Sequence, residues 1–212
     1  MKGNVLNVNS KTISEINLSE GFFSVPEKKH LIYSAIRTQR TNKRRGTAST
    51  QQRGDVSYST KKMRPQKGSG RSRQGARTSN IWKGGAVAFG PHPKTYHIKL
   101  NKNEKRVAIF SALSSKFREG NVHIVEGIKI TGKTKEIVQL FNGVSDNLKK
   151  ELGTILLVYS DMNGEVALAA NNIPYCKSLN FKFLNVYDIV VYESILFTKE
   201  AVGEMQGWWK NE

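Results

Sequence analysis

The chain has 212 residues, which is enough for one ordinary domain with a hydrophobic core. It carries 34 Lys and Arg against 17 Asp and Glu, a formal net charge of +17, so its partner should be a polyanion, either nucleic acid or an acidic membrane surface. A single cysteine excludes an intrachain disulfide and no apolar run reaches the length of a membrane span, so we expect a cytoplasmic protein without a membrane partner.

The first elements predicted along the chain are a short hairpin and a helix. Apolar residues alternate loosely with polar ones over residues 5–18, which is typical of two paired strands. Ser24 is followed by Pro26 and Glu27, a pattern typical of a helix start, and apolar residues then recur at helical spacing. We expect this helix to end near Arg40, where a basic segment begins.

Most of the net charge lies in that basic segment. Residues 37–103 contain 17 of the 34 Lys and Arg but one acid, Asp55. Residues 37–83 are rich in Gly, Ser, Thr, Asn and Gln, so they cannot bury enough apolar surface to offset their ordering entropy. A solvated linker is the alternative interpretation. Linkers mix charges or avoid them, however, whereas a cationic stretch almost without acids binds polyanions, which favours a nucleic-acid-binding loop.

Regular elements return after the basic segment. Asn101 with Glu104 predicts a capped helix that ends at Gly120. The elements expected next are a strand at 122–125, a helix around 137–141, a buried strand at 154–159, a short helix at 164–171, a strand containing Ile189, Val190 and Val191, and a last helix capped by Thr198. This alternation predicts an α/β fold, with a mostly parallel sheet flanked by helices.

A long extended basic loop is therefore expected to be inserted after the first helix of an α/β domain. Residues 1–40 and 101–212 should form the globular α/β domain, and residues 41–100 the basic RNA-binding loop, with its tip near 61–73. The final helix carries Trp208 and Trp209, which either fold back on the domain or offer a docking spot for a neighbour.

The loop has the chemistry of a phosphate-binding segment. Lys and Arg neutralise phosphates, and the planar fork of Arg also stacks on bases. Trp82 is either a stacking group or a hydrophobic anchor where the loop rejoins the domain. The residues predicted to bind RNA are Arg44, Arg45, Arg53, Lys61, Lys62, Arg64, Lys67, Arg71, Arg73, Arg77, Trp82, Lys83 and Lys94.

Two stretches of the loop carry a resemblance to a known family. Residues 64–73 read Arg-Pro-Gln-Lys-Gly-Ser-Gly-Arg-Ser-Arg, and residues 81–91 read Ile-Trp-Lys-Gly-Gly-Ala-Val-Ala-Phe-Gly-Pro. Together they resemble the bacterial-type large-subunit ribosomal protein L-four. The match is specific over residues 61–113, and elsewhere it rests on the order of elements and on length. Arg64 stands where the family usually has an aromatic residue, which puts an aromatic contact at the tip in doubt.

The resemblance implies a structural constituent of the large ribosomal subunit. Its expected partners are large-subunit rRNA, the L-twenty-two protein and the nascent peptide, because the family's loop reaches the wall of the peptide exit tunnel. Neither a cofactor nor a homo-oligomer is expected. The residues that the resemblance assigns to the tip at the tunnel are Arg64, Pro65, Gln66, Lys67, Gly68, Ser69 and Gly70.

Two other functions are weaker interpretations of the same sequence. A nucleotide-binding enzyme would need a glycine-rich loop between a strand and a helix, but Gly68-Ser69-Gly70 lies inside a polar cationic run. The histidines His30, His92, His97 and His123 show no metal-ligand spacing, and Cys176 stands alone, so neither a metal site nor an enzyme is expected. A basic architectural DNA-binding protein is the other alternative, and it would prefer duplex DNA to folded rRNA.

Overall fold

The chain divides into two compact units. The computed structural model describes residues 2–7, 13–126, 132–148, 151–160 and 164–211. One unit comprises residues 1–39 and 99–212 and is called the α/β unit here. Residues 40–98 form the second, called the basic unit because it holds 14 of the 34 Lys and Arg but one of the 17 acids.

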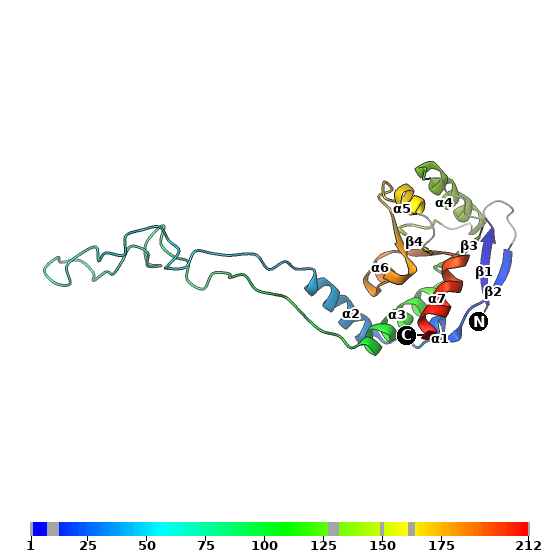
Figure 1. Cartoon of the computed structure of the whole chain (residues 1–212), viewed down its shortest axis with the longest axis horizontal. Coiled ribbons are helices and arrows are strands. Elements are labelled where there is room, and N and C mark those ends of the chain that lie inside the picture. Colours follow the sequence, from blue (N-terminus) through cyan, green and yellow to red (C-terminus); the bar gives the residue numbers. More distant parts are fainter. Residues whose placement is uncertain (1, 8–12, 127–131, 149–150, 161–163, 212) are drawn as a thin grey trace. The chain divides into compact units, whose positions relative to one another are not determined.

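A mixed sheet forms the centre of the α/β unit (Figure 1). Six strands with the order β2-β1-β3-β6-β4-β5 are present in the described residues, and only the β1–β2 pair is antiparallel. The mostly parallel sheet is thereby confirmed. The strands are β1 (Lys2–Asn7), β2 (Ile13–Asn17), β3 (Val122–Glu126), β4 (Ile155–Tyr159), β5 (Cys176–Asn180) and β6 (Ser194–Thr198).

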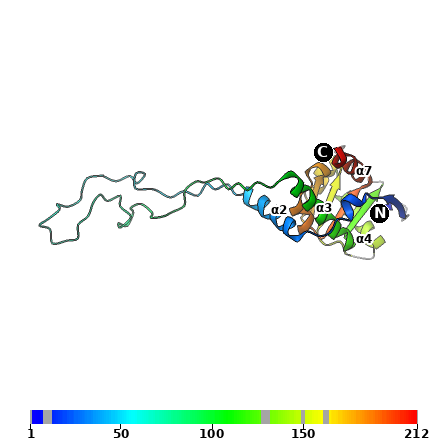
Figure 2. The same cartoon turned by 90° about the horizontal axis from the view of Figure 1, so that it is seen from below.

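Helices cover both faces of this sheet, as α/β architecture requires when both faces of the strands are apolar. The helices are α1 (Glu20–Phe23), α2 (Lys29–Asn42), α3 (Lys102–Arg118), α4 (Thr134–Leu148), α5 (Gly164–Ala170), α6 (Val186–Val191) and α7 (Lys199–Asn211), with a 3-10 turn, η1, at Phe181–Phe183. Core residues of α1, α3, α6 and α7 share one apolar cluster, and those of α4 and α5 share the other. In the turned view α4 and α7 lie on opposite sides of the α/β unit (Figure 2).

Alternate residues of the central strands supply the two clusters. In β4, Leu156 and Val158 belong to the first cluster, whereas Ile155 and Leu157 belong to the second. All four side chains are buried, which is why this stretch reads as a continuous apolar run in the sequence. The strand predicted at 154–159 is confirmed.

The predicted N-terminal hairpin is also confirmed. Val5 in β1 lies opposite Ser14 in β2, and Gly3 lies opposite Ile16. Residues 8–12, where the connection between the strands was expected, lie outside the described residues. On its other edge β1 pairs in parallel with β3, where Val5 faces Ile124, so the hairpin extends the sheet rather than standing apart from it.

The predicted start of the first long helix is wrong. Ser24 does not begin this helix. It is the C-cap of the short helix α1, where its backbone N–H donates to the carbonyl of Glu20 at 3.0 Å. The following backbone N–H of Val25 donates to Ser114 Oγ at 3.0 Å, and that of Lys28 donates to Ser111 Oγ at 2.7 Å. Two serines of α3 thus hold this segment in non-helical conformation, and α2 begins at Lys29.

The strand predicted at Ile189–Val191 is wrong as well. These residues belong to helix α6, in which Ile189 is buried and Val190 and Val191 are exposed. The helix is capped by Asn185, whose side-chain oxygen accepts from the backbone N–H of Asp188 at 2.8 Å. The last two strands are instead β5 and β6. The sequence Cys-Lys-Ser-Leu-Asn of β5 lacks the apolar pattern that would have predicted it.

The predicted caps at the starts of α3 and α7 are confirmed. Asn101 and Glu104 form the expected capping box at the start of α3, in which the backbone N–H of Asn101 donates to Glu104 Oε2 at 3.3 Å. Thr198 Oγ1 accepts from the backbone N–H of Ala201 at 3.2 Å at the start of α7.

Trp208 and Trp209 fold back on the α/β unit. Both pack against the first core cluster, and their rings meet Phe181 at 6.3 Å and Phe110 at 5.3 Å between centroids. This is the first of the two interpretations of these residues.

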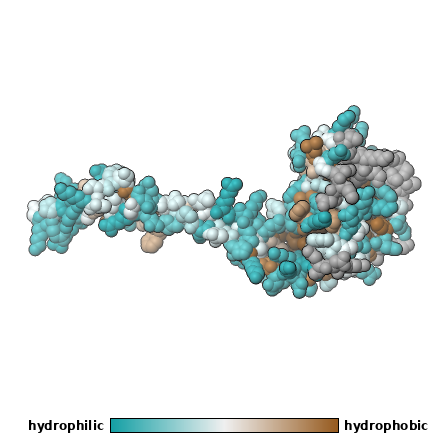
Figure 3. Space-filling model, in the orientation of Figure 1, coloured by the Kyte–Doolittle hydropathy of each residue, from teal (hydrophilic) through white to brown (hydrophobic). Residues whose placement is uncertain are grey.

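The basic unit, which is described throughout, has no helix or strand beyond the last turn of α2. Its outgoing and returning segments, called limbs here, run alongside one another in both views (Figures 1 and 2). Backbone hydrogen bonds join residues 46–51 of the first limb to residues 87–94 of the second. Its surface is mostly hydrophilic (Figure 3). Within residues 40–98 the buried side chains are those of Val56 and Thr78. Burial of apolar surface therefore contributes little to the order of this unit.

Candidate nucleic-acid interface

All thirteen residues predicted to bind RNA lie in the basic unit. Most have exposed side chains, and only Arg64 and Trp82 are half-buried. The cationic groups are therefore available to a partner. The exposed residues are Arg44, Arg45, Arg53, Lys61, Lys62, Lys67, Arg71, Arg73, Arg77, Lys83 and Lys94.

None of these cations forms an ion pair with a carboxylate in the part of the chain that the structure describes. The single acid of the unit, Asp55, accepts a hydrogen bond from the backbone N–H of Gln52 at 3.0 Å and so closes a turn. Lys62 Nζ donates to Gln66 Oε1, a neutral partner. The positive charge of this unit is thus not balanced by its own acids. A polyanion could bind these cations without first breaking ion pairs.

The two limbs are joined close to the start of the unit. The side chain of Asn42 donates to the carbonyl of Ile98 at 3.1 Å and accepts from its N–H at 2.8 Å, which mimics a backbone pair. Further along, the backbone N–H of Lys94 donates to the carbonyl of Gly46 at 3.0 Å. A Cβ at position 46 would lie 1.9 Å from the carbonyl oxygen of Lys94, and φ is +66°, so the close approach requires glycine.

Aromatic rings position several of the cations. The guanidinium carbon of Arg44 lies 4.0 Å from the ring centroid of Tyr96, and Lys94 Nζ lies 5.0 Å from the same centroid. The guanidinium carbon of Arg77 lies 5.1 Å from the ring centroid of Tyr58. Such cation–π contacts restrict long side chains while leaving their charge exposed. Cations and aromatic rings from distant parts of the sequence are thereby brought into contact.

Sequence comparison identifies the family. Residues 16–208 match the family model described as Ribosomal protein L4/L1 family. The chain belongs to this family. It is 37% identical to the Large ribosomal subunit protein uL4 of Lachnoclostridium phytofermentans over 95% of this chain and 96% of that protein. The protein of the same name from Geotalea daltonii is 36% identical over 97% of each chain, and that from Thermoanaerobacter pseudethanolicus is 38% identical over 94% of each.

Residues 64–70, which are predicted to form the tip of the loop, make an irregular turn. Gly68 and Gly70 have φ values of +87° and +62°, a conformation that glycine adopts without steric cost. Pro65, Gln66, Lys67 and Ser69 are exposed around them, and Arg64 is half-buried. The two glycines therefore turn the backbone here. The place of this turn in a ribosome stays a prediction.

Trp82 lies in a compact turn of the basic unit. Its backbone N–H donates to the carbonyl of Ser79 at 3.2 Å, and its carbonyl accepts from Gly85 at 3.0 Å. Its indole Nε1 is buried and has no hydrogen-bond partner among the described residues. The ring is thus partly used within the unit itself, and its contact with RNA remains a prediction.

Sequence reasoning missed two aromatic residues of this family member's basic unit. One is Tyr96, whose ring is in contact with the cations of Arg44 and Lys94. Its contact with Arg44 could not be predicted, because the two residues are far apart in the sequence. Phe89, which is fully exposed, lies in the stretch that carries the family resemblance, and no role of its own was predicted for it. An aromatic residue next to glycine in a cationic stretch was the available signal for Phe89 in the sequence.

The described residues offer neither a membrane-spanning helix nor a metal-binding cluster. No helix there is long and apolar enough to cross a bilayer. The described side chains also contain no group of three His, Cys, Asp or Glu residues that could hold a metal ion.

Proposed function

We propose that this chain is a structural, non-enzymatic constituent of the large ribosomal subunit in the cytoplasm. In this proposal it binds large-subunit rRNA through the basic unit, mainly by neutralising phosphates. Membership of the L4/L1 family supports the assignment, and its relatives from three bacteria carry the name Large ribosomal subunit protein uL4.

The observation that carries the proposal is the unbalanced charge of the basic unit. Fourteen Lys and Arg accompany a single acid over residues 40–98, and none of these cations is ion-paired with a described carboxylate. A segment with so little buried apolar surface gains a defined environment when its cations meet phosphates, because each contact releases counterions from the RNA. The α/β unit has its own core and serves as a folded anchor.

The decisive measurement is co-sedimentation with the large subunit over a range of salt concentrations. The chain should travel with the particle at low salt and leave it only at high salt, since monovalent cations compete with Lys and Arg for phosphates. Competition between folded large-subunit rRNA and duplex DNA is the control for specificity. A preference for duplex DNA, or release that is insensitive to salt, would contradict the proposal.

The finer part of the proposal places the tip, residues 64–70, at the wall of the nascent-peptide exit tunnel. The L-twenty-two protein and the nascent peptide would then be neighbours of the tip. The turn at Gly68 and Gly70, with Lys67 exposed beside it, supports a compact cationic projection. The replacement of the family's usual aromatic by Arg64 would make this part of the wall more cationic.

A tip substitution tests this placement separately from assembly. Lys67→Glu should alter macrolide binding or nascent-chain stalling while subunit assembly continues, because a single exposed charge near the tip contributes little to total RNA affinity. Lys83→Glu changes the same charge in the basic unit outside residues 64–70 and serves as the matched control. Normal drug binding and normal stalling in ribosomes that carry Lys67→Glu would argue against a position in the tunnel wall.

A further inference from the structure

Phe89 has two features that phosphate neutralisation does not explain. Its side chain is fully exposed although it is large and apolar. Its φ is +52°, and within the described ranges it is the one residue other than glycine with a positive φ. A bulky side chain in this backbone region is strained. The folded unit therefore tolerates two unfavourable features at one position.

The opposite limb holds Phe89 in this conformation. On one side of it, the backbone N–H of Val87 donates to the carbonyl of Gln51 at 3.2 Å. On the other side, the carbonyl of Pro91 accepts from the backbone N–H of Thr50 at 3.0 Å. Strain of this kind persists where the surroundings fix the backbone, and it is found mostly at functional positions. The ring of Phe89 is thus presented to solvent by a defined framework.

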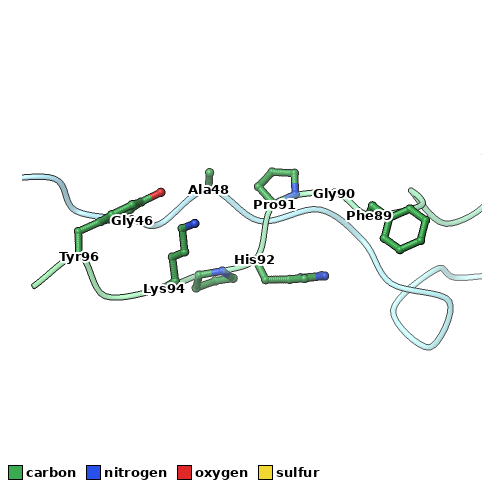
Figure 4. A pocket seen from close by; sticks show the side chains of 9 residues that line it. Gly46, Ala48, Phe89, Gly90, Pro91, His92, Lys94 and Tyr96 are labelled. Carbon is green, nitrogen blue, oxygen red and sulfur yellow. The ribbon is translucent and has the colours of Figure 1, made fainter. Parts of the chain in front are cut away.

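A pocket of about 410 Å³ lies next to this ring. Figure 4 shows Tyr96 and Phe89 at its two ends, with Pro91, His92 and Lys94 between them. The amide nitrogen of Gln52 lies 3.4 Å from the imidazole of His92 at the same place. Aromatic and proline rings, a cation and a few polar groups line this pocket, which has the size of a small-ligand site.

The aromatic residues of the basic unit differ in what their faces meet. Tyr96 is in contact with Arg44 and Lys94, Tyr58 is in contact with Arg77, and Trp82 is half-buried. Throughout residues 40–98, which are all described, Phe89 is the aromatic that is fully exposed and has no ring or cation contact. It can therefore accept a planar partner without losing an internal interaction.

The surrounding charge identifies the class of that partner. Lys94 borders the pocket, and Arg44 lies over Tyr96 at its far end. An apolar protein side chain would cover the ring but leave these cations unmatched, whereas a nucleotide brings a planar base together with a phosphate. Unpaired bases in loops and bulges of folded RNA stack on exposed aromatic side chains in this way.

We propose that Phe89 stacks on an unpaired nucleobase of the bound RNA, and that the adjoining pocket receives this nucleotide with Lys94 near its phosphate. The inference rests on the proposed function, because it names a specific contact of the same interface. It adds a base-stacking contact to an interface that otherwise relies on charge.

The test measures binding of the full chain to protein-free large-subunit rRNA over several salt concentrations. Phe89→Asn removes the ring, and Asn tolerates a positive φ, so the backbone is preserved. This variant should bind about 5- to 150-fold more weakly, the loss typical of one base–aromatic stack. Its salt dependence should equal that of the unsubstituted chain, because no charge is removed. Phe89→Tyr should bind as tightly as the unsubstituted chain.

Ile81→Asn is the matched control, since Ile81 is also a largely exposed apolar residue of the basic unit, and its affinity should be unchanged. Equal affinity of Phe89→Asn and the unsubstituted chain for protein-free rRNA would overturn the inference. So would a loss that appears only in particles containing other proteins, which would assign the ring to a protein neighbour. If the unsubstituted chain showed no salt-dependent rRNA binding, the proposed function itself would fail.

Discussion

Cys176 lies in β5 among apolar side chains of the second core cluster, and its surroundings control its chemistry. Burial raises the pKa of its thiol from 9.0 to about 12, because the thiolate would lose its hydration. A thiol that stays protonated is a poor nucleophile, so this cysteine behaves as a small apolar core residue rather than a reactive group.

A pH dependence of stability follows from this shift. The unfolded chain loses the thiol proton near pH 9, before the folded chain does, so the contribution of Cys176 to stability should be present below pH 9 and lost as pH rises toward 12. Urea unfolding of the unsubstituted chain and of Cys176→Ala at matched pH measures the effect. The stability advantage of the unsubstituted chain should shrink above pH 9. An advantage that is constant across this range would contradict the assigned pKa.

At the scale of single elements, local capping and tertiary contacts determine where helices begin. Helix α3 starts where its sequence predicts, because the capping box of Asn101 and Glu104 is local. The non-helical segment before α2 depends instead on Ser111 and Ser114 of α3, which lie far away in the sequence. Ser111 also donates to the carbonyl of Pro26 at 3.2 Å, and Ser114 to that of Phe22 at 3.3 Å. Each serine therefore accepts from one backbone N–H and donates to one backbone carbonyl of this region.

Removal of the α3 cap should destabilise the α/β unit. Asn101→Ala leaves a backbone N–H of the first turn without its side-chain acceptor, which typically costs about 1 kcal/mol. The free energy of unfolding from urea titration measures the loss. Lys105→Ala, an exposed change in the same turn, is the control and should have a small effect. Equal unfolding midpoints for the two variants would show that the capping box contributes little.

For the whole molecule, charge and apolar surface are allotted to different units. The two core clusters lie in the α/β unit and include no residue of 40–98, while the basic unit holds 14 of the 34 Lys and Arg but only one of the 17 acids. Folding of the first unit therefore does not require the cations of the second. Binding and folding can be separated by mutation.

A deletion tests this separation. Replacement of residues 53–77 by a short Gly-Ser linker removes eight Lys and Arg and one acid. Cooperative unfolding of the α/β unit should persist, because its core is intact. Affinity for rRNA should fall, and its dependence on salt should become shallower, since fewer phosphates are neutralised. Circular dichroism and binding titrations measure the two outcomes. Full affinity after the deletion, or loss of the folded α/β unit, would contradict this division.

Sequence reasoning succeeded where the signal was local or compositional. The capping box of α3, the cap at Thr198, the apolar run of β4 and the segregation of charge can be read from neighbouring residues, because each depends on contacts within a turn or on burial of the strand as a whole. It failed for Ile189–Val191, whose β-branched side chains favour a strand. There Asn185 caps a helix, and Asp188 accepts a hydrogen bond from Lys177 at 2.7 Å.

The amino-acid sequence by itself thus determined the α/β class and the cationic character of residues 40–98, since periodicity and charge are properties of the chain. Only the tertiary structure decided the start of α2, the contact of Arg44 with Tyr96 and the exposed, strained ring of Phe89. These features arise between segments distant in the sequence. Their energies depend on which groups the folded chain brings within a few ångströms of one another, and local patterns carry no record of that.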